Sequence, residues 1–267
     1  MGIVSFINSF FSKKNTEIIS FYSENRLSRT LARSFAKPIN GLITSQWKHK
    51  YLDNAHSVFF FGNPELWFLF EMIKKYSLNF YYTDKAYFDR SNYFRITKNA
   101  LQLNNFVDFN SARFDSFKIP ILPRRYGSKI LICPQSETFF KLNGLSRENW
   151  LNNTIQEIRQ YSDRPIEIRY KERTNTEAAF SEALKDIHCV VVHTSVAGVQ
   201  SVLSGVPSFS THDCAATYFS SGPLANIESP FIPDNIYELA CALANSQWTI
   251  EEIRQGLPHE SLGIKML

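Results

Sequence analysis

The sequence predicts an α/β protein built from two Rossmann-like lobes. Two series of alternating strands and helices, one in each half of the chain, indicate this class, because such series form parallel sheets. Between them, residues 120–125 contain two prolines and two arginines, which is typical of a linker. We therefore expect residues 1–125 to form one lobe and residues 126–267 to form the other.

The first half begins with a stretch over residues 16–36 whose apolar positions favour a helix. Residues 57–61 form an apolar run that predicts a buried strand. Asn63, followed by proline, is a good N-cap for a helix that runs to Tyr76. Residues 80–83 predict the next strand and complete a βαβ unit without a GxGxxG loop.

The second half has the order β-α-β-α-β-α-β. Its expected strands cover residues 129–133, 166–170, 189–192 and 208–210. Four of its helices are expected to begin at Ser146, Ser195, Asp234 and Thr249. A further helix is expected to begin at a capping box formed by Thr174 and Glu177. This order predicts a doubly wound lobe.

Residues 188–210 read as strand, tight turn, short helix and strand. Ser195 is expected to cap the helix, and Gly205 is expected to end it. Ligands of open α/β sheets bind beyond the carboxyl ends of the strands. The N–H groups that open a helix favour phosphate there, so this stretch predicts a phosphate site.

The pattern HTSxAGxxxxLxGxPxxS, which runs from His193 to Ser210, resembles the donor-side signature of GT-B glycosyltransferases. Capsule-type transferases and small phage-type glycosyltransferases carry similar variants. The resemblance covers about a third of the chain. Many members place a glutamate in this helix to hold the donor ribose, whereas this chain has Gln200, which can form hydrogen bonds but carries no charge.

The resemblance implies two lobes that face each other across a cleft, with C-terminal helices crossing back to the first lobe. Residues 1–125 would be the acceptor side, and residues 126–267 would bind a nucleotide sugar. It also implies metal-independent transfer with no cofactor besides that co-substrate. The residues expected to bind the donor are Ser136, Arg169, Lys171, His193, Thr194, Ser195, Gly198 and Gln200.

A general base must take a proton from the acceptor hydroxyl. Asp84, at the end of a first-lobe strand, is the first candidate, and Asp89 is the second. Asp213 could instead contact the donor sugar. The residues expected to bind the acceptor are Tyr87, Arg90, Tyr93 and Arg95. The alternative for this segment is a solvated loop with anchoring aromatic residues.

Three classes of function compete. The first is a glycosyltransferase whose acceptor is a hydroxymethylated base of phage-type DNA or, in the alternative, a surface polysaccharide. The second is a non-catalytic module that binds a nucleotide or nucleic acid, although no DNA-binding motif is present. The third is a sugar-nucleotide epimerase, which would need carboxylates inside the cleft. The net charge of +4 permits an acidic partner but does not require one.

The four cysteines show no CxxC spacing, so we expect reduced thiols in a cytoplasmic protein rather than disulfides or a zinc site. No apolar run is long enough for an integral membrane segment. The apolar first dozen residues precede two lysines, the reverse of the order in a signal peptide. They favour an amphipathic helix docked on the protein, with a membrane-surface anchor as the alternative.

Overall fold

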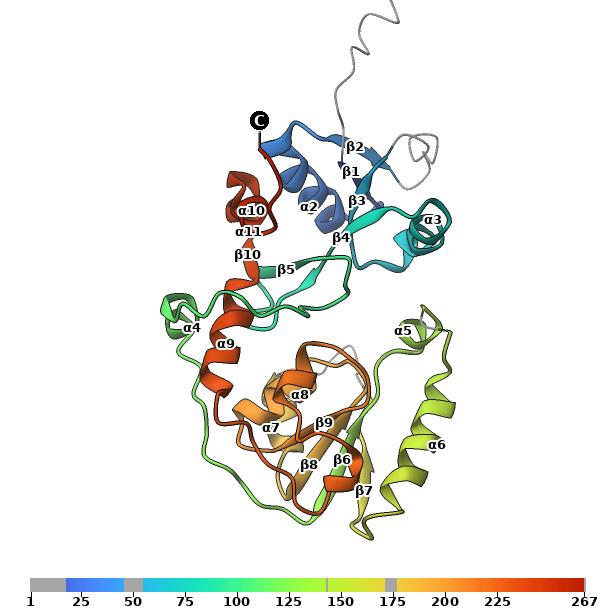
Figure 1. Cartoon of the computed structure of the whole chain (residues 1–267), viewed down its shortest axis with the longest axis vertical. Coiled ribbons are helices and arrows are strands. Elements are labelled where there is room, and N and C mark those ends of the chain that lie inside the picture. The colour runs from blue at the N-terminus through green and yellow to red at the C-terminus, as the bar shows by residue number, and fades with distance from the viewer. Residues whose placement is uncertain (1–17, 46–54, 143, 171–176, 267) are drawn as a thin grey trace, which may run out of the picture. The chain divides into compact units, whose positions relative to one another are not determined.

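The structure is a computed structural model that describes residues 18–45, 55–142, 144–170 and 177–266 (Figure 1). The chain divides into two compact units, one formed by Met1–Asp84 with Trp248–Leu267 and the other by Lys85–Gln247. The predicted boundary between residues 125 and 126 was drawn by function, between an acceptor side and a donor side. This functional boundary stays a prediction. The expected N-terminal helix and the capping box at Thr174 lie outside the described residues.

The first unit contains four parallel strands, paired in the order β4-β3-β1-β2. They are β1 (Ile18–Tyr22), β2 (Leu42–Ser45), β3 (Ser57–Phe61) and β4 (Asn79–Lys85). The βαβ unit predicted from residues 57–83 is confirmed. Its connection is a short 3-10 turn, in which the Asn63 side chain accepts a hydrogen bond from the Glu65 N–H, followed by α3 (Phe68–Tyr76).

The helix predicted over residues 16–36 is wrong in its first half. Residues 18–22 are β1, which pairs with β2 on one side and β3 on the other, and its side chains Ile18, Ile19 and Phe21 are buried. The helix α2 (Arg26–Ala36) begins only after Asn25, whose side chain accepts from the N–H groups of Leu27 and Ser28. Burial in the sheet therefore overrides the helical spacing of these residues.

The end of the chain belongs to the first unit. From Trp248 on it comprises the rest of β10 (Gln247–Thr249), α10 (Ile250–Gln255) and α11 (Leu257–Ser261), and α10 packs against α2. The predicted cap at Thr249 is confirmed, since Thr249 and Glu252 form a capping box. On α11 the buried His259 donates through Nε2 to the Phe35 carbonyl, 2.8 Å away. Phe35 in turn stacks on Phe59, with ring centroids 3.9 Å apart, so the tail completes this core.

The second unit is built on four parallel strands in the order β7-β6-β8-β9. They are β6 (Lys129–Cys133), β7 (Ile166–Ile168), β8 (Ile187–Val192) and β9 (Ser208–Ser210). The helices are α4 (Ala112–Ser116), α5 (Glu137–Leu142), α6 (Arg147–Ile158), α7 (Glu177–Ala183), α8 (Ala197–Leu203) and α9 (Ile236–Asn245). The unit also holds β5 (Tyr93–Lys98).

The central strands β6 and β8 are buried on both faces, as their apolar runs predict, whereas the edge strand β7 is largely exposed. Val190 and Val192 of β8 pack in a cluster with α7, α8 and α9. Cys189 and Val191 alternate with them and pack against α6, which lies on the other side of the sheet (Figure 1). All four cysteines are buried and free, as expected.

Two predicted helix starts need correction. Asn235, not Asp234, is the N-cap of α9. The N-cap of α8 is Val196, although the Ser195 hydroxyl accepts a hydrogen bond from the Ala197 N–H. The predicted end of α8 is confirmed, because Gly205 has φ 81° and an added Cβ would lie 2.1 Å from the Pro123 carbonyl oxygen. Only glycine fits this turn.

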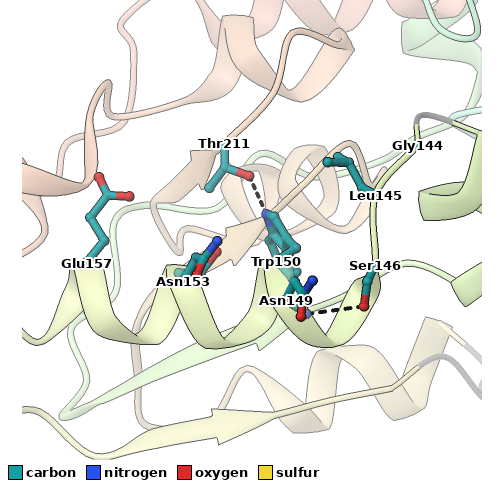
Figure 2. A pocket seen from close by; sticks show the side chains of 9 residues that line it. Gly144, Leu145, Ser146, Asn149, Trp150, Asn153, Glu157 and Thr211 are labelled. Atoms are coloured by element: carbon teal, nitrogen blue, oxygen red, sulfur yellow. Dashed lines mark hydrogen bonds between the residues drawn. The ribbon is translucent and has the colours of Figure 1, made fainter.

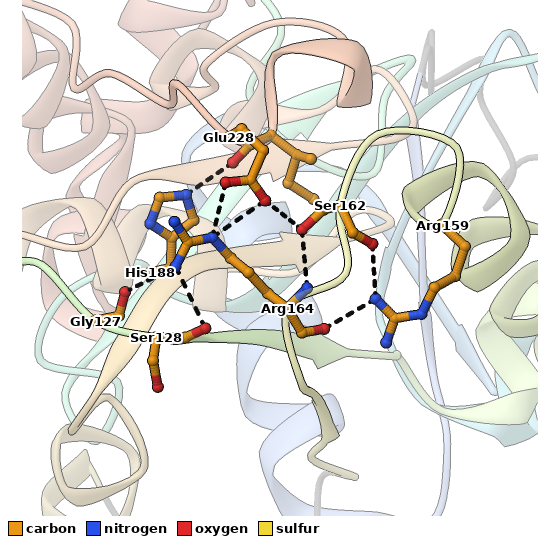
Figure 3. A network of polar contacts seen from close by, with 8 residues as sticks. Gly127, Ser128, Arg159, Ser162, Arg164, His188 and Glu228 are labelled. Carbon is orange, nitrogen blue, oxygen red and sulfur yellow. Dashed lines mark hydrogen bonds and ion pairs between the residues drawn. The ribbon is translucent and has the colours of Figure 1, made fainter.

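The amino ends of the strands are joined by a polar network (Figure 3). Arg164 donates to both carboxylate oxygens of Glu228, at 3.2 and 3.0 Å, and also to the carbonyls of Gly127 and Ser128. His188, at the start of β8, donates to the Ile227 carbonyl at 2.8 Å. The network ties the loop around residue 228 to the edge of the sheet opposite the strand carboxyl ends.

Segment 85–117 belongs to the same unit as the second sheet. The buried Gln247 holds it, since Gln247 Oε1 accepts from the N–H groups of Tyr87 and Phe88 and its Nε2 donates to the Phe88 carbonyl, each at 3.0 Å. The rings of Phe88 and Phe114 pack in the cluster under α9. One side chain thus satisfies three backbone groups that burial would otherwise leave unpaired.

We predict that Gln247→Ala lowers the free energy of unfolding by about 2–4 kcal/mol, because it strands buried backbone groups. Urea denaturation of the purified variant measures this loss. Gln156→Ala, on the exposed side of α6, is the matched control and should change stability by no more than about 0.5 kcal/mol. Equal stability of the two variants would contradict the role given to Gln247.

Candidate functional site

Polar side chains from three neighbouring strands meet at the carboxyl edge of the second sheet. Gln135 follows β6, Thr194 follows β8 and Thr211 follows β9. The Thr194 hydroxyl donates to Gln135 Oε1, and Gln135 Nε2 donates to the Thr194 carbonyl at 3.0 Å. This reciprocal pair fixes the turn between β8 and α8, where sequence reasoning placed a ligand site.

Gln102, which lies outside the sheet, forms a further hydrogen bond to this pair. Its side-chain Nε2 also donates to the Thr194 carbonyl, and the side chain is buried. Its Oε1 is buried without a hydrogen-bond partner among the residues that the structure describes. Gln102 was not among the residues predicted to form the site, since nothing near it in sequence indicates a partner at residue 194.

His193 is the most buried of the predicted donor-binding side chains, with 3% of its surface exposed. Its ring stacks between Phe140 and His212, with ring centroids 4.9 Å away on each side. Nδ1 lies 3.2 Å from the Thr211 hydroxyl, while Nε2 is buried with no partner in the described part of the chain. An unpaired buried ring nitrogen costs stability, and a ligand that reached it would supply the missing hydrogen bond.

Burial lowers the pKa of His193 to about 4, and the neighbouring His212 acts in the same direction. His193 is therefore uncharged near neutral pH and can offer a ligand a neutral hydrogen bond rather than a positive charge. The positive charge for a phosphate has to come from another residue.

Two positively charged residues, Arg169 and Lys171, were predicted to bind the donor, and of these the structure describes Arg169. It directly follows β7, and its guanidinium lies over the Phe180 ring, 5.1 Å from the centroid. Burial raises the pKa of the Cys133 thiol, at the end of β6, to about 12, and the charge of Arg169 opposes this shift. Arg169 therefore lies close to the carboxyl end of β6. Lys171 is outside the described residues.

The other predicted donor residues have mixed roles. Gly198 is a packing position, because an added Cβ would come within 3.0 Å of Ala216 and 3.1 Å of Val192. Ser136 is exposed, and its carbonyl accepts from the Phe139 N–H. Gln200 is half-buried on α8. Since α8 has seven residues, any phosphate contact depends more on the strand ends than on a helix dipole.

The two candidate bases differ in their surroundings. Asp84 is half-buried near the carboxyl end of β4. Asp89 has φ 43°, and its carboxylate accepts from the Asn92 side-chain amide at 2.9 and 3.1 Å. The Asp89 carbonyl also accepts from the N–H groups of Asn92 and Tyr93, so this residue shapes a tight turn.

The predicted acceptor-binding residues are largely used by the fold. Tyr87 is 1% exposed, and its hydroxyl accepts from the Leu103 N–H at 2.8 Å. Arg95 is 4% exposed, lies over the Tyr87 ring and donates to the carbonyls of Lys85 and Leu101. Arg90 donates to the Ala86 carbonyl, and Tyr93 packs edge-on against Phe117. The segment is therefore anchored in the second unit rather than solvated.

A cavity of about 400 Å³ adjoins this edge, between α6 and the residue after β9 (Figure 2). Trp150 lines it, and its indole N–H donates to the Thr211 hydroxyl at 2.8 Å. The same hydroxyl faces His193 Nδ1, so Thr211 links the cavity wall to the buried imidazole. Trp150 was not among the predicted site residues, because a tryptophan on an amphipathic helix is typical of a core residue.

Two solved structures share the fold of this chain. Both come from Thermosulfurimonas dismutans KpsC, and they are described as a beta Kdo 2,4 transferase and a beta Kdo 2,7 transferase. The first has a TM-score of 0.52 and 10% identity over 91% of this chain and 98% of that one. The second has a TM-score of 0.52 and 11% identity over 92% and 99%.

At this level of identity the likeness concerns the fold, a mixed α/β architecture with two sheets. No protein-family model matches the chain, and no curated protein matches it significantly. Among the described residues, no helix has the length and apolar character needed to cross a bilayer.

We predict that His193 makes folding sensitive to acid. Its pKa is near 6.5 in the unfolded chain and about 4 in the folded one, so only the unfolded state gains this proton between those pH values. Stability should therefore fall with decreasing pH in this window, by about 3 kcal/mol in total from this residue.

Urea denaturation between pH 7 and pH 4 measures this effect. His193→Gln should flatten the slope of unfolding free energy against pH, whatever its stability at pH 7. His56→Gln changes an exposed histidine and should keep the wild-type slope. If His193→Gln also keeps the wild-type slope, that result contradicts the burial of His193 seen in the structure.

Proposed function

We propose that this protein is a glycosyltransferase that moves a sugar from a nucleotide-sugar donor to a hydroxyl of a polysaccharide. One observation carries the proposal: the hydrogen-bonded side chains of Gln135, His193, Thr194 and Thr211 meet at the carboxyl edge of three parallel strands. In a fold like that of two Kdo transferases, this edge is where a donor would bind.

In the proposed reaction, the bond between the anomeric carbon and a phosphate oxygen breaks, and the acceptor oxygen bonds to that carbon. The acceptor proton passes to a carboxylate, and the departing phosphate keeps the negative charge. Arg169 stabilises this charge at the strand ends, with Lys171 as a second cation. His193 Nε2 and Gln102 Oε1 supply neutral hydrogen-bonding groups.

We include the finer features of a GT-B enzyme in the proposal: two lobes that share the reaction, and metal-independent transfer in which basic side chains balance the leaving group. We also include a cytoplasmic location, which free, buried cysteines favour and where nucleotide sugars are available.

A polysaccharide acceptor is favoured over DNA because of where the loop residues lie. The predicted acceptor residues would hold DNA through phosphate contacts from arginines, among them Arg95, and through base stacking on aromatic rings, among them Tyr87. Both side chains are buried and bonded within the second unit. Modified DNA remains an arm of the test.

The test is incubation with a panel of nucleotide sugars while the release of free nucleotide is measured, with polysaccharide fragments or hydroxymethylated DNA as acceptors. Release stimulated by a glycan supports the proposal, and release stimulated only by DNA overturns its acceptor. If the protein binds nucleotides but releases no free nucleotide from any donor, it is a non-catalytic binding module.

We predict that Arg169→Ala weakens nucleotide binding roughly ten- to a hundredfold, because it removes a charge-assisted contact. Isothermal titration calorimetry with the nucleotide that the panel identifies measures the change. Arg254→Ala, an exposed arginine on α10, is the control and should bind as the wild type does. Unchanged affinity of the folded Arg169→Ala variant would remove Arg169 from the site.

We predict that Asp84→Asn lowers the transfer rate roughly 10²- to 10⁴-fold and leaves donor affinity intact, as expected for loss of a general base. The substitution keeps the shape of the side chain and removes its basicity. Rates with saturating donor and acceptor measure the effect, and Asp234→Asn, at an exposed position, is the control. Transfer at the wild-type rate would make Asp89 the next candidate.

A further inference from the structure

The cavity beside the strand edge has a chemical character of its own. Its lining residues are Gly144, Leu145, Ser146, Asn149, Trp150, Asn153, Thr154, Glu157 and Thr211. They combine an aromatic ring, two carboxamides, three hydroxyls and one carboxylate. Among the described residues that line it there is no lysine or arginine, so these side chains offer no positive charge to a phosphate or a carboxylate ligand.

These groups match a polyhydroxylated ring. Asn149 and Asn153 offer donors and acceptors to hydroxyl groups, and Glu157 offers two acceptors. Trp150 offers an apolar surface to the C–H face of a sugar. Figure 2 shows Asn153 and Glu157 on the side of α6 that faces Thr211. A volume of about 400 Å³ lies within the range of small-molecule sites.

The tryptophan is held in place before any ligand arrives. Its indole N–H donates to Thr211, and its ring centroid lies 5.3 Å from that of Phe140 and 5.7 Å from that of His193. A fixed aromatic ring loses little conformational entropy on binding. This contact chain also connects the cavity to the proposed donor edge through one hydroxyl group, that of Thr211.

We infer that this cavity binds an uncharged sugar unit of the acceptor glycan and disfavours an acidic one, because Glu157 repels a carboxylate. The inference rests on the proposed function and specifies the acceptor. The donor is a poor match for the cavity, since its phosphates would meet a negative side chain, and Arg169 and Ser195 are not among the lining residues.

Binding can be measured without any transfer. The protein, labelled with ¹⁵N, is titrated with methyl glucoside, methyl galactoside and methyl N-acetylglucosaminide, and separately with methyl glucuronide. The indole N–H signal of Trp150, assigned with Trp150→Phe, reports on the cavity. We expect at least one neutral glycoside to shift this signal and expect the glucuronide to leave it in place.

Two neighbouring asparagines provide a matched pair. Asn153→Ala should raise the dissociation constant of the neutral glycoside roughly three- to tenfold, through loss of a hydrogen bond. Asn152→Ala, at an exposed position outside the lining, should leave it unchanged. Glu157→Gln should let methyl glucuronide bind.

Several results would overturn the inference: equal binding of glucoside and glucuronide by the wild type, equal effects of the two asparagine variants, or no shift with any neutral glycoside. Failure here is separable from failure of the proposed function. Nucleotide binding that depends on Arg169, without glycoside binding, leaves the transferase proposal standing and removes this cavity as its acceptor site. If neutral glycosides bind but no donor releases nucleotide, the cavity stands as a sugar site and the transferase proposal is removed.

Discussion

The parallel register of three strands is the constraint on which the candidate site depends. Cys133, Val192 and Ser210 are paired across β6, β8 and β9, so these strands end side by side. The next residues of each strand must then share one edge, whatever their distance in sequence. The pair of Gln135 with Thr194 and the pair of His193 with Thr211 both follow from this register.

The edge also holds two buried groups, His193 Nε2 and Gln102 Oε1, that have no hydrogen-bond partner among the residues that the structure describes. Native proteins pair almost all such atoms, because each unpaired one costs roughly 1–3 kcal/mol. Here the stacked rings of Phe140 and His212 exclude the solvent that would otherwise pair with the imidazole. A fold that tolerates this cost beside a strand edge gains two preorganised hydrogen-bonding groups for a ligand.

The parts of the fold that depend on local pattern could be predicted from the sequence. The apolar runs gave β3, β6 and β8 within a residue or two, and Asn63, Ser146 and Thr249 mark real helix starts. Long-range contacts could not be predicted. Gln102 bonds to a residue 92 positions away, and Gln247 to one 160 away, and nothing near either glutamine in sequence indicates its partner.

The segment after β4 shows why composition alone does not distinguish an acceptor site from a buried polar turn. Its arginines and aromatic residues are also what a buried polar turn needs: Arg95 satisfies two carbonyls and covers the Tyr87 ring, and Tyr87 accepts from a backbone N–H. These side chains cannot leave their contacts to hold a ligand without exposing the core beneath them. Under the proposed function, acceptor recognition is therefore better served by exposed polar groups, and Asn153 and Glu157 on the α6 wall of the cavity are such groups.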